Sequence, residues 1–567
     1  MRTALRQTAK RVARALGIRR SPSDQQKTID RDVRDFDARY RDILAQHPSP
    51  SQGAGDALGN ASGDTLIVAL HGHVPTLKTE GCLAKGLQAR GMRIRPLIYQ
   101  SDRNARKIYA TFGITDVLAW EDFLNESDRG GYKHRVSDFV EGGPGFEDWL
   151  GFEHHGSIVG EHAMSWVVRQ QHAGQIDLAD PRTLGLFRQA LVDGMLAVDA
   201  ACRLFDELSP KLVLFCERGY TPFGDLFDSA LRRNLNVVQW LGSHTDHALH
   251  AKRYTWDTRT AHPISLHTKT WQAVTAMDLP EDQVFIDDFK RRYETGDYNN
   301  RHNLQKGKRI LPREELASQL GLDPNKKTAV IFSHILWDAT FFYGKGLFPD
   351  YAQWLVETIK SACVNDQVNW LIKLHPINVW RLALDGCQEE LAEHVLIREC
   401  VGKLPGHIKT IDPDTPINTA SLWGAIDYAL TVRGTVGMEL PMFGTTVLTA
   451  GTGRYAGLGF TVDSDTREQY LDRLANIQNI EPISPQQVAL ARRHAQGIFG
   501  LRPLPFKSFT LSYPHGEYPA FLHPKVTINA PDIDTFAHAP DLQRFARWAC
   551  EEDSLDLLGQ GPDGGAA

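Results

Sequence analysis

The sequence predicts an α/β chain built from two Rossmann-like halves. Short apolar runs rich in β-branched residues alternate with helical patterns in two series, one starting at residue 65 and the other at residue 328. Such alternation indicates parallel sheets whose strands are joined by right-handed crossovers. A length of 567 residues is sufficient for two such domains. We therefore expect the two halves to face each other across a cleft that holds a ligand.

The first half is expected to contain four strands. They are predicted at residues 65–70, 93–99, 211–216 and 236–242, with helices at 77–91 and 183–208. The β-branched content of the apolar runs favours strands, and a strand, a helix and a second strand in succession form a parallel unit. Residues 120–182 are polar and aromatic, and we interpret them as a helical insertion.

The second half repeats this alternation. Strands are predicted at 328–334, 370–374, 427–432 and 445–451, and helices at 351–363, 434–440 and 466–477. The predicted boundaries are a basic amphipathic helix and flexible linker at 1–62, the first half at 63–260, a connection at 261–325, the second half at 326–500, a C-terminal segment with a closing helix at 501–555, and a disordered tail at 556–567.

The composition is that of an ordinary globular protein. A net charge of −6 argues against a protein that binds nucleic acid through its overall charge. Seven cysteines without a C-x-x-C pair favour reduced thiols in a cytoplasm. No apolar run approaches the ~20 residues that span a bilayer, and no apolar signal segment follows the basic start. We expect a soluble cytoplasmic protein.

Residues 1–20 differ from the rest of the chain because they contain seven Lys and Arg residues and no acidic residue. Leu5, Val12 and Leu16 recur at helical spacing, which predicts a helix with a basic face and an apolar stripe. This pattern is typical of a helix on an anionic membrane surface, here the inner face of the plasma membrane. The alternatives are a solvated N-terminus and pairing with an acidic patch.

Polar residues follow four successive predicted strands of the second half. They are Ser333 and His334, Lys373 and His375, Arg433 to Thr435, and Gly451 to Arg454. The carboxyl ends of parallel strands meet at one edge of the sheet, which is where such sheets bind ligands. The sequence therefore predicts a positive site for an anionic ligand such as a nucleotide monophosphate or diphosphate.

The segment TVRGTVGMEL carries the most informative pattern at this edge. Gly434 would let a phosphate approach the backbone, and Thr435 would add a hydroxyl at a helix N-terminus, whose N–H groups and dipole favour anions. Glu439 lies on the same helical face as Thr435, where it would bind a ribose. Pro376 ends the preceding strand, and His375 would act as a donor to phosphate or as an acid. The alternatives are an ordinary N-cap, a solvated glutamate and a histidine that caps a carbonyl.

The motif K-x-H-P, followed by R-G-T-V-G-x-E and then by T-A-G-T-G-R-Y, resembles bacterial capsule and surface-polysaccharide biosynthesis proteins. These are glycosyltransferases of the two-domain GT-B architecture. The resemblance covers about residues 210–475 and includes the fragments IFSHILWDATFFYGKGLF and HALHAKRYT. Its His-Pro element also occurs in GT-B enzymes that use CMP-sialic acid, CMP-Kdo or CDP-glycerol. CMP-Kdo enzymes have Gln-Ser-Ser where this chain has Arg433 to Thr435, so the donor stays open.

The resemblance implies a metal-independent, cofactor-free enzyme with its donor site in the second half. His375 and Pro376 would contact the donor phosphate, Arg433 to Thr435 would form the phosphate loop, and Glu439 would bind the ribose. The other residues predicted at the donor site are Lys373, Gly453 and Arg454.

The first half is expected to supply a catalytic base that deprotonates the acceptor. The competing candidates are His71, His73, Glu217 and Asp225. A retaining mechanism without a base is the alternative. Lys252 and Arg253 are predicted to contact the acceptor, with His334 as a further contact. Trp337 is expected either to stack on a base or sugar or to pack in the core.

The predicted function is the transfer of a sugar from a nucleotide-activated donor to a capsule or other cell-surface polysaccharide or lipid-linked acceptor. The alternatives are a CDP-polyol phosphotransferase on the same scaffold, a sugar-nucleotide epimerase, and a non-catalytic assembly factor that binds nucleotide or glycan.

Overall fold

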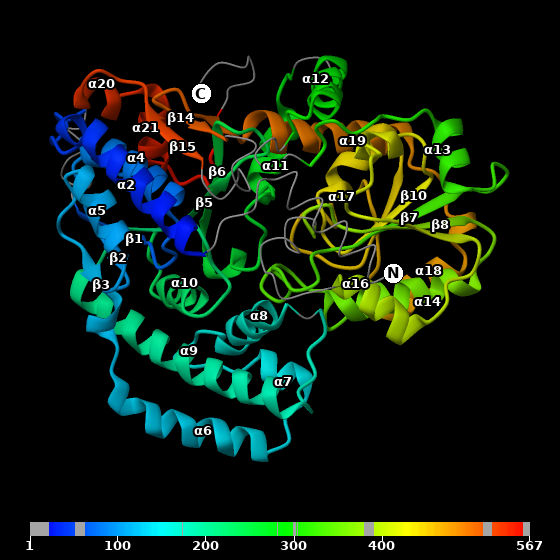
Figure 1. Ribbon diagram of the computed structural model, residues 1–567, viewed down its shortest axis with the longest axis horizontal. Coiled ribbons are helices and arrows are strands. Elements are labelled where there is room, and N and C mark those ends of the chain that lie inside the picture. Colours follow the sequence, from blue (N-terminus) through cyan, green and yellow to red (C-terminus); the bar gives the residue numbers. More distant parts are fainter. Residues whose placement is uncertain are drawn as a thin grey trace. The chain divides into compact units, whose positions relative to one another are not determined.

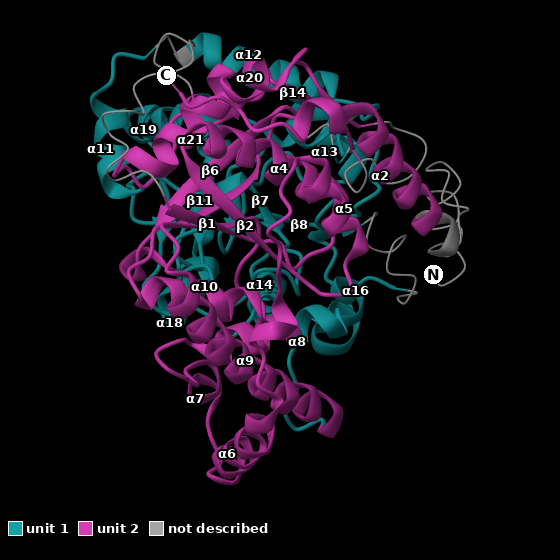
Figure 2. Cartoon of the chain, turned by 90° about the vertical axis from the view of Figure 1, so that its left-hand side faces the viewer, with its two compact units in different colours: residues 1–16, 167–180, 260–500 teal, residues 17–166, 181–259, 501–567 magenta. Residues whose placement is uncertain are grey.

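The computed structural model describes residues 22–51, 63–172, 174–279, 282–298, 302, 304–378, 390–513 and 524–559. The chain forms two compact units (Figures 1 and 2). Among the described residues, unit 1 comprises 167–180 and 260–500, and unit 2 comprises the remainder. The basic helix predicted at 1–20 lies outside the described residues.

Unit 1 is built around a parallel sheet with the strand order β12-β11-β10-β7-β8-β9. The strands are β7 (Thr328–Phe332), β8 (Asn369–Lys373), β9 (Ile408–Ile411), β10 (Tyr428–Thr431), β11 (Thr446–Thr449) and β12 (Val462–Asp463). Every residue of β7, β8, β10 and β11 is buried, as expected for strands covered on both faces. The order reverses between β7 and β10, which is the switch point where Rossmann-type sheets bind ligands.

Helices cover both faces of this sheet. They are α11 (Thr268–Ala276), α12 (Asp282–Thr295), α13 (Arg313–Leu320), α14 (Tyr351–Val364), α16 (Ala392–Leu396), α17 (Val436–Glu439), α18 (Arg467–Ala475) and α19 (Pro485–Ala495). Residues 261–325, set apart as a connection in the sequence, belong to unit 1. Phe289 of α12 packs with Met438 and Met442, so this helix is anchored beside α17.

Unit 2 contains a mixed sheet with the order β13-β6-β5-β4-β1-β2-β3. The strands are β1 (Gly63–Val68), β2 (Met92–Ile98), β3 (Leu118–Ala119), β4 (Leu212–Phe215), β5 (Val237–Gly242), β6 (Ala248–Tyr254) and β13 (Leu504–Pro505). β1 to β5 are parallel, whereas β6 and β13 are antiparallel to their neighbours. The predicted α/β fold class with two Rossmann-like halves is confirmed.

The helices of unit 2 include the predicted insertion. Those of the sheet region are α2 (Pro22–Leu44), α4 (Val74–Ala89), α5 (Arg103–Thr111), α9 (Pro181–Leu208) and α10 (Phe223–Arg232), and the insertion contributes α6 (Arg129–Glu141), α7 (Phe146–Leu150) and the start of α8 (Val159–Gln171). α9 packs against both α6 and α10 (Figure 1). Among the described residues, no helix is both long enough and apolar enough to cross a membrane.

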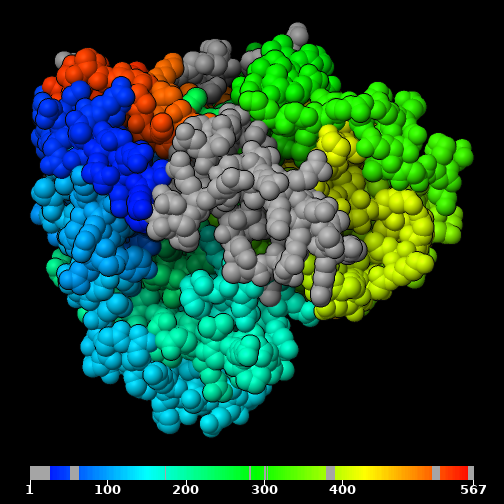
Figure 3. Space-filling model, viewed as in Figure 1, coloured from blue at the N-terminus to red at the C-terminus, as the bar shows by residue number. Residues whose placement is uncertain are grey.

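The C-terminal segment completes unit 2. It contains β14 (Phe509–Ser512), β15 (Lys525–Ile528), α20 (Ile533–Ala537) and α21 (Pro540–Glu551). Figure 3 shows these orange and red residues beside the blue residues of α2, and the backbone N–H of Ser49 donates to Asp534 Oδ1 at 2.7 Å. The two ends of the described chain therefore pack into the same unit.

The structure differs from two predictions, one for the end of this segment and one for the β6 residues that contact it. Residues 556–559 are not part of a disordered tail, because Asp556 is 2% exposed and accepts a hydrogen bond from Lys252 Nζ at 2.5 Å. Lys252 and Arg253 are not placed as acceptor contacts. Arg253 donates to Asn236 Oδ1 and to the carbonyl of Ser554, so both basic residues hold the C-terminal segment against β6.

Candidate functional site

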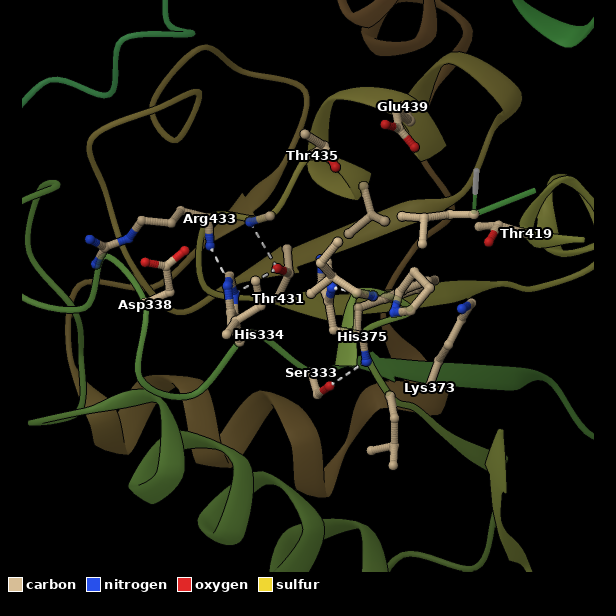
Figure 4. Close-up of a pocket in the computed structure, with 18 of the residues that line it drawn as sticks. Ser333, His334, Asp338, Lys373, His375, Thr419, Thr431, Arg433, Thr435 and Glu439 are labelled. Carbon is tan, nitrogen blue, oxygen red and sulfur yellow. Dashed lines mark hydrogen bonds between the residues drawn. The ribbon is translucent and has the colours of Figure 1, made fainter. Parts of the chain in front are cut away.

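A pocket of about 480 Å³ lies at the switch point of the unit 1 sheet (Figure 4). Its walls come from the residues that follow β7, β8, β10 and β11 and from the segment after α12. The predicted donor residues that line it are Lys373, His375, Pro376, Arg433, Gly434, Thr435, Glu439 and Arg454, together with His334. Four strand ends that are far apart in the sequence therefore meet, as the sequence predicted.

Three basic side chains of this pocket form no ion pair within the described part of the chain, although Glu439, which lines the same pocket, attracts Arg454 at longer range. Arg433 is 5% exposed, and neither its Nε nor its Nη1 has a hydrogen-bond partner there. The Nε of Arg454 also has none, while its Nη1 donates to the carbonyl of Arg433 at 3.2 Å. Lys373 is likewise 5% exposed. Because an unpaired buried charge is costly, this imbalance is suited to an anionic ligand.

Lys373 is the last residue of β8 and has an unusual pKa. Burial, and then the nearby ammonium of Lys308, lower the pKa of Lys373 to about 7. An anion beside this amine would favour its charged form and raise the pKa again. Lys373 is therefore able to gain a proton when an anionic ligand binds.

His375 is held by its own turn. Its backbone N–H donates to Ser333 Oγ at 3.0 Å, and its Nδ1 accepts the N–H of Ile377 at 3.2 Å. Since Nδ1 is an acceptor, the neutral ring carries its proton on Nε2. Figure 4 shows His375 in the pocket between Ser333 and Thr431. The ring is thus in the tautomer that donates from Nε2.

His334 organises the turn that carries Arg433 (Figure 4). Its Nε2 accepts from Thr431 Oγ1 at 3.1 Å and from the Val432 N–H at 3.0 Å, and its ring stacks on Tyr351. Burial, followed by the charge of Arg433, holds the pKa of His334 well below its usual value. The neutral imidazole therefore fixes the end of β10. Because its Nε2 already accepts two hydrogen bonds, this nitrogen is not available to contact the sugar acceptor of a transfer.

The predicted helix N-terminus differs from expectation. α17 has only four residues, Val436–Glu439, so its dipole is small. The N–H of Gly434 donates to Thr431 Oγ1 at 3.0 Å and is not available to a phosphate. A Cβ at Gly434 would lie 2.8 Å from that hydroxyl, which explains why a glycine fits there. The attraction for anions therefore comes from the basic side chains.

Glu439 is more enclosed than predicted. It is 2% exposed, and its carboxylate accepts from the hydroxyls of Tyr293 at 2.8 Å and Tyr298 at 2.6 Å. The two tyrosine rings stack with centroids 4.2 Å apart. Burial raises the pKa of Glu439. Neither tyrosine was predicted at the site, although Ile286, Phe289 and Tyr293 recur at the spacing of a buried helix face.

Two further predicted residues do not line the pocket. Gly453 adopts a φ of +97°, and its carbonyl accepts the N–H of His262 at 2.8 Å. A Cβ at Gly453 would lie 2.9 Å from Gly344 Cα. The glycine at this position therefore allows two loops to approach closely. Trp337 is 6% exposed and meets His172 edge-on. Of the two possibilities left open for Trp337, the structure therefore shows core packing.

The histidine base candidates lie after β1 in unit 2. His71 borders a second pocket of about 710 Å³ at the ends of β1 and β2. Its Nδ1 accepts the N–H of His73 at 3.0 Å, and its Nε2 lies 3.4 Å from Glu80 Oε1. The Nδ1 of His73 lies 2.7 Å from Thr76 Oγ1 at the start of α4. Both nitrogens of His71 are therefore engaged inside the protein.

The acidic base candidates follow β4. Asp225 is fully buried, and burial raises its pKa to about 7. The charge of His162 and the hydroxyl of Thr221 offset part of this shift. Glu217 is partly exposed, and its Oε1 accepts the N–H of Arg218 at 2.9 Å. Only Glu217 of these two is placed where a substrate could reach it.

Two groups of side chains have the composition of a metal site. They are His71, Glu80 and Cys216, and His154, His155 and Asp199. His71 accepts the N–H of His73 at Nδ1, so its proton lies on the Nε2 that faces Glu80. His154 accepts an N–H of Arg135 at Nδ1, so its proton lies on the Nε2 that faces Asp199. A metal ligand must present an unprotonated nitrogen. Both groups are accordingly hydrogen-bonded pairs.

The parallel sheet of unit 1 with its pocket at a switch point, and the mixed sheet of unit 2, define an α/β protein with two Rossmann-like halves. No family model matches the chain, and no curated protein matches it in sequence. It is similar in structure to the beta Kdo 2,4 transferase KpsC of Thermosulfurimonas dismutans, with 14% identity and a TM-score of 0.29 over 58% of this chain and 87% of that chain.

It is also similar to the calicheamicin glycosyltransferase CalG4, with 13% identity and a TM-score of 0.26 over 81% of this chain and 96% of that chain. A third likeness is to the UDP-GlcNAc 2-epimerase from Neisseria meningitidis, with 10% identity and a TM-score of 0.25 over 77% and 96% of the two chains. The glycosyltransferases named from the motifs are thus found again among these structures.

Proposed function

We propose that the protein transfers a sugar from a nucleotide-activated donor to an acceptor of a cell-surface polysaccharide, with the unit 1 pocket as the donor site. The observation that carries this proposal is the group of three basic residues, Lys373, Arg433 and Arg454, that line one pocket and form no ion pair among the described residues. The phosphate of a nucleotide sugar would supply the missing negative charge. The K-x-H-P and R-G-T-V-G-x-E motifs support the same assignment.

Cleavage of the sugar–phosphate bond leaves negative charge on the departing phosphate. Buried cations that are already in position stabilise that charge strongly, because the pocket replaces water by fixed dipoles and charges. Arg433 and Arg454 would supply this stabilisation, and the Nε2–H of His375 would donate to a phosphate oxygen. Lys373 would take up a proton as the anion binds.

The nucleoside end of the donor would lie toward Glu439. Its oxygens are already occupied by two tyrosine hydroxyls. The proposed ribose contact therefore requires a ribose hydroxyl to replace one of them. For the base, we retain Glu217 and His73, which are both partly exposed.

Nucleotide binding is the direct test. Wild-type protein should show a higher unfolding temperature with at least one of CMP, CDP, UDP, GDP and ADP, and His375→Ala and Arg433→Ala should lose that shift and the turnover of the matching sugar nucleotide. Arg473→Ala is the control, because that residue already bonds to Ser464 Oγ at 2.7 Å. Wild-type responses in both site variants would remove the assignment.

Product analysis separates the proposal from its rivals. A transferase releases free nucleotide only as the acceptor gains a sugar, whereas a polyol phosphotransferase adds a polyol phosphate. Turnover of the sugar nucleotide without an acceptor would indicate epimerisation. Binding without any nucleotide release would indicate an assembly factor.

We also propose that residues 1–20 bind the inner membrane surface through their basic residues. Replacing their seven Lys and Arg residues by Gln should abolish sedimentation with anionic liposomes. Unchanged sedimentation would contradict this role.

A further inference from the structure

The sequence His-Pro-Ile occurs twice in the chain, and both copies reach the unit 1 pocket. Residues 375–377 follow β8, and residues 262–264 lie just before α11. His262 and His375 both line the pocket, although only His375 was predicted there. The earlier copy therefore brings to the site a histidine that no strand-end pattern indicated.

The two histidines make the same local hydrogen bond. The N–H of Ile264 donates to His262 Nδ1 at 2.9 Å, and the N–H of Ile377 donates to His375 Nδ1 at 3.2 Å. Because proline has no N–H, the isoleucine N–H is the first backbone hydrogen-bond donor after each histidine. The repeated sequence thus gives a repeated local geometry.

This geometry fixes the proton of the ring. A neutral imidazole whose Nδ1 accepts a hydrogen bond carries its proton on Nε2 and donates from there. The His-Pro pair alone does not enforce this tautomer, because the Nδ1 of His47 lies 3.1 Å from the carbonyl of Pro48 and donates to it. His262 therefore shares with His375 the tautomer that donates from Nε2.

His262 is held beside the loop that carries Arg454. The backbone N–H of His262 donates to the carbonyl of Gly453 at 2.8 Å, and its carbonyl accepts the hydroxyl of Ser265 at 2.6 Å. The centre of its ring lies 4.7 Å from that of Tyr343, which also lines the pocket. The histidine is thus positioned by contacts on both of its sides, next to one of the three basic residues of the pocket.

We infer that His262 binds the phosphate of the sugar nucleotide, donating from Nε2 to a phosphate oxygen as His375 does. A phosphate presents several oxygens, and each one that is buried without a hydrogen bond is costly. Two neutral N–H groups satisfy such oxygens without adding a further charge to the three basic residues. Fixed N–H groups also stabilise the charge that develops on the departing phosphate. The inference rests on the proposed function, because it adds a residue to the same site.

Two substitutions separate this role from a purely structural one. Asparagine places its amide where Nδ1 lies, so His262→Asn keeps an acceptor for the Ile264 N–H and loses the Nε2 hydrogen-bond donor. His262→Gln places an N–H near the position of Nε2 instead. His262→Asn should keep the unfolding temperature of wild type and bind phosphate ligands about tenfold to hundredfold more weakly, because a hydrogen bond to a charged group is lost. His262→Gln should bind within about threefold of wild type.

Isothermal titration calorimetry with inorganic pyrophosphate, and with CMP, CDP, UDP, GDP and ADP, measures these affinities on the full chain. Thermal unfolding without ligand checks the fold of each variant. His267→Asn is the matched control, because His267 Nδ1 also accepts the N–H two residues ahead, that of Lys269 at 3.3 Å, and His267 does not line the pocket. Its affinities should equal those of wild type.

Two results would overturn the inference. One is wild-type affinity in His262→Asn, and the other is weak binding by a folded His262→Gln, which decides the question if His262→Asn does not fold. A nucleotide affinity that does not depend on His262 refutes only this inference. Pyrophosphate binding that depends on His262, without binding of any nucleotide, refutes only the sugar-nucleotide assignment, and no binding of either ligand refutes both.

Discussion

Replacing Arg433 by methionine should stabilise the free protein and abolish nucleotide binding. Arg433 is 5% exposed, and two of its guanidinium nitrogens have no hydrogen-bond partner in the described chain. Each unpaired buried polar group costs about 1–3 kcal/mol. The guanidinium lies 5.8 Å from the centre of the Tyr351 ring, a contact worth about 0.5–1 kcal/mol that methionine would lose. The net stabilisation should be about 1–5 kcal/mol.

Thermal unfolding with and without nucleotide measures both effects. A change of 1 kcal/mol shifts the midpoint of a 150–250-residue domain by about 2–4 °C, so the variant should unfold at least about 2 °C above wild type. Removing one partner of a buried charge contact with the phosphate costs about 2–5 kcal/mol, which weakens binding at least about 30-fold. The nucleotide-induced shift should therefore disappear.

Arg473→Met provides the matched control. Arg473 is a partly buried arginine of unit 1 whose Nη1 donates to Ser464 Oγ and to the carbonyl of Asp463. Its replacement should lower the unfolding temperature and leave the nucleotide response intact. If Arg433→Met were less stable than wild type, or responded equally to nucleotide, the reasoning about unpaired basic residues would be wrong.

Three further predictions concern other residues. Burial lowers the pKa of Lys373 to about 7 from 10.5 in the unfolded chain. Between pH 7 and 10.5 folding therefore releases a proton from this amine, and the stability of the protein should rise with pH. The gain in unfolding temperature from Lys373→Met should accordingly shrink between about pH 7 and 10, whereas Lys345→Met, at an exposed lysine, should show no such trend. Glu439→Gln should lower the free energy of unfolding by roughly 1–3 kcal/mol, because an amide N–H donor would face a tyrosine hydroxyl. The unfolding temperature should fall, and an unchanged unfolding midpoint would contradict the hydrogen bonds to that carboxylate. Lys252→Met should cost less in urea unfolding than the about 3–5 kcal/mol of an uncompensated buried charge, because Arg502 Nη2 stays 3.7 Å from Asp556. Asp556→Leu should cost more than Lys252→Met, because it removes the acid that faces both Lys252 and Arg502, and nucleotide binding should stay normal in both variants.

The strand ends of the donor pocket were predictable because their signal is local. Trp370 to Ile372 is an apolar run that ends at Lys373, and a buried parallel strand is the simplest structure that it forms. The position of Lys373 and His375 at the ligand edge then follows from the topology of parallel sheets. Arg433 and Arg454 were found by the same reasoning, since each follows a comparable run.

The contacts that the sequence did not reveal join distant residues. Tyr293 and Glu439 are separated by 146 positions, and no local pattern pairs a helix of the predicted connection with the turn after β10. Lys252 and Asp556 are 304 positions apart, and the histidine and basic residues of β6 concealed a buried strand. The engagement of both His71 nitrogens depends on the fold of its own loop, which residue types alone do not specify.

The discontinuity of unit 2 has a consequence for how the chain is made. Its sheet is completed by β13, and its final helix and residues 556–559 leave the ribosome only after all of unit 1. Unit 1 is thus able to fold during translation, whereas unit 2 must wait with the edge of β6 uncovered. An exposed strand edge invites association with other chains. Nascent protein should therefore need chaperone protection chiefly in its earliest-synthesised part.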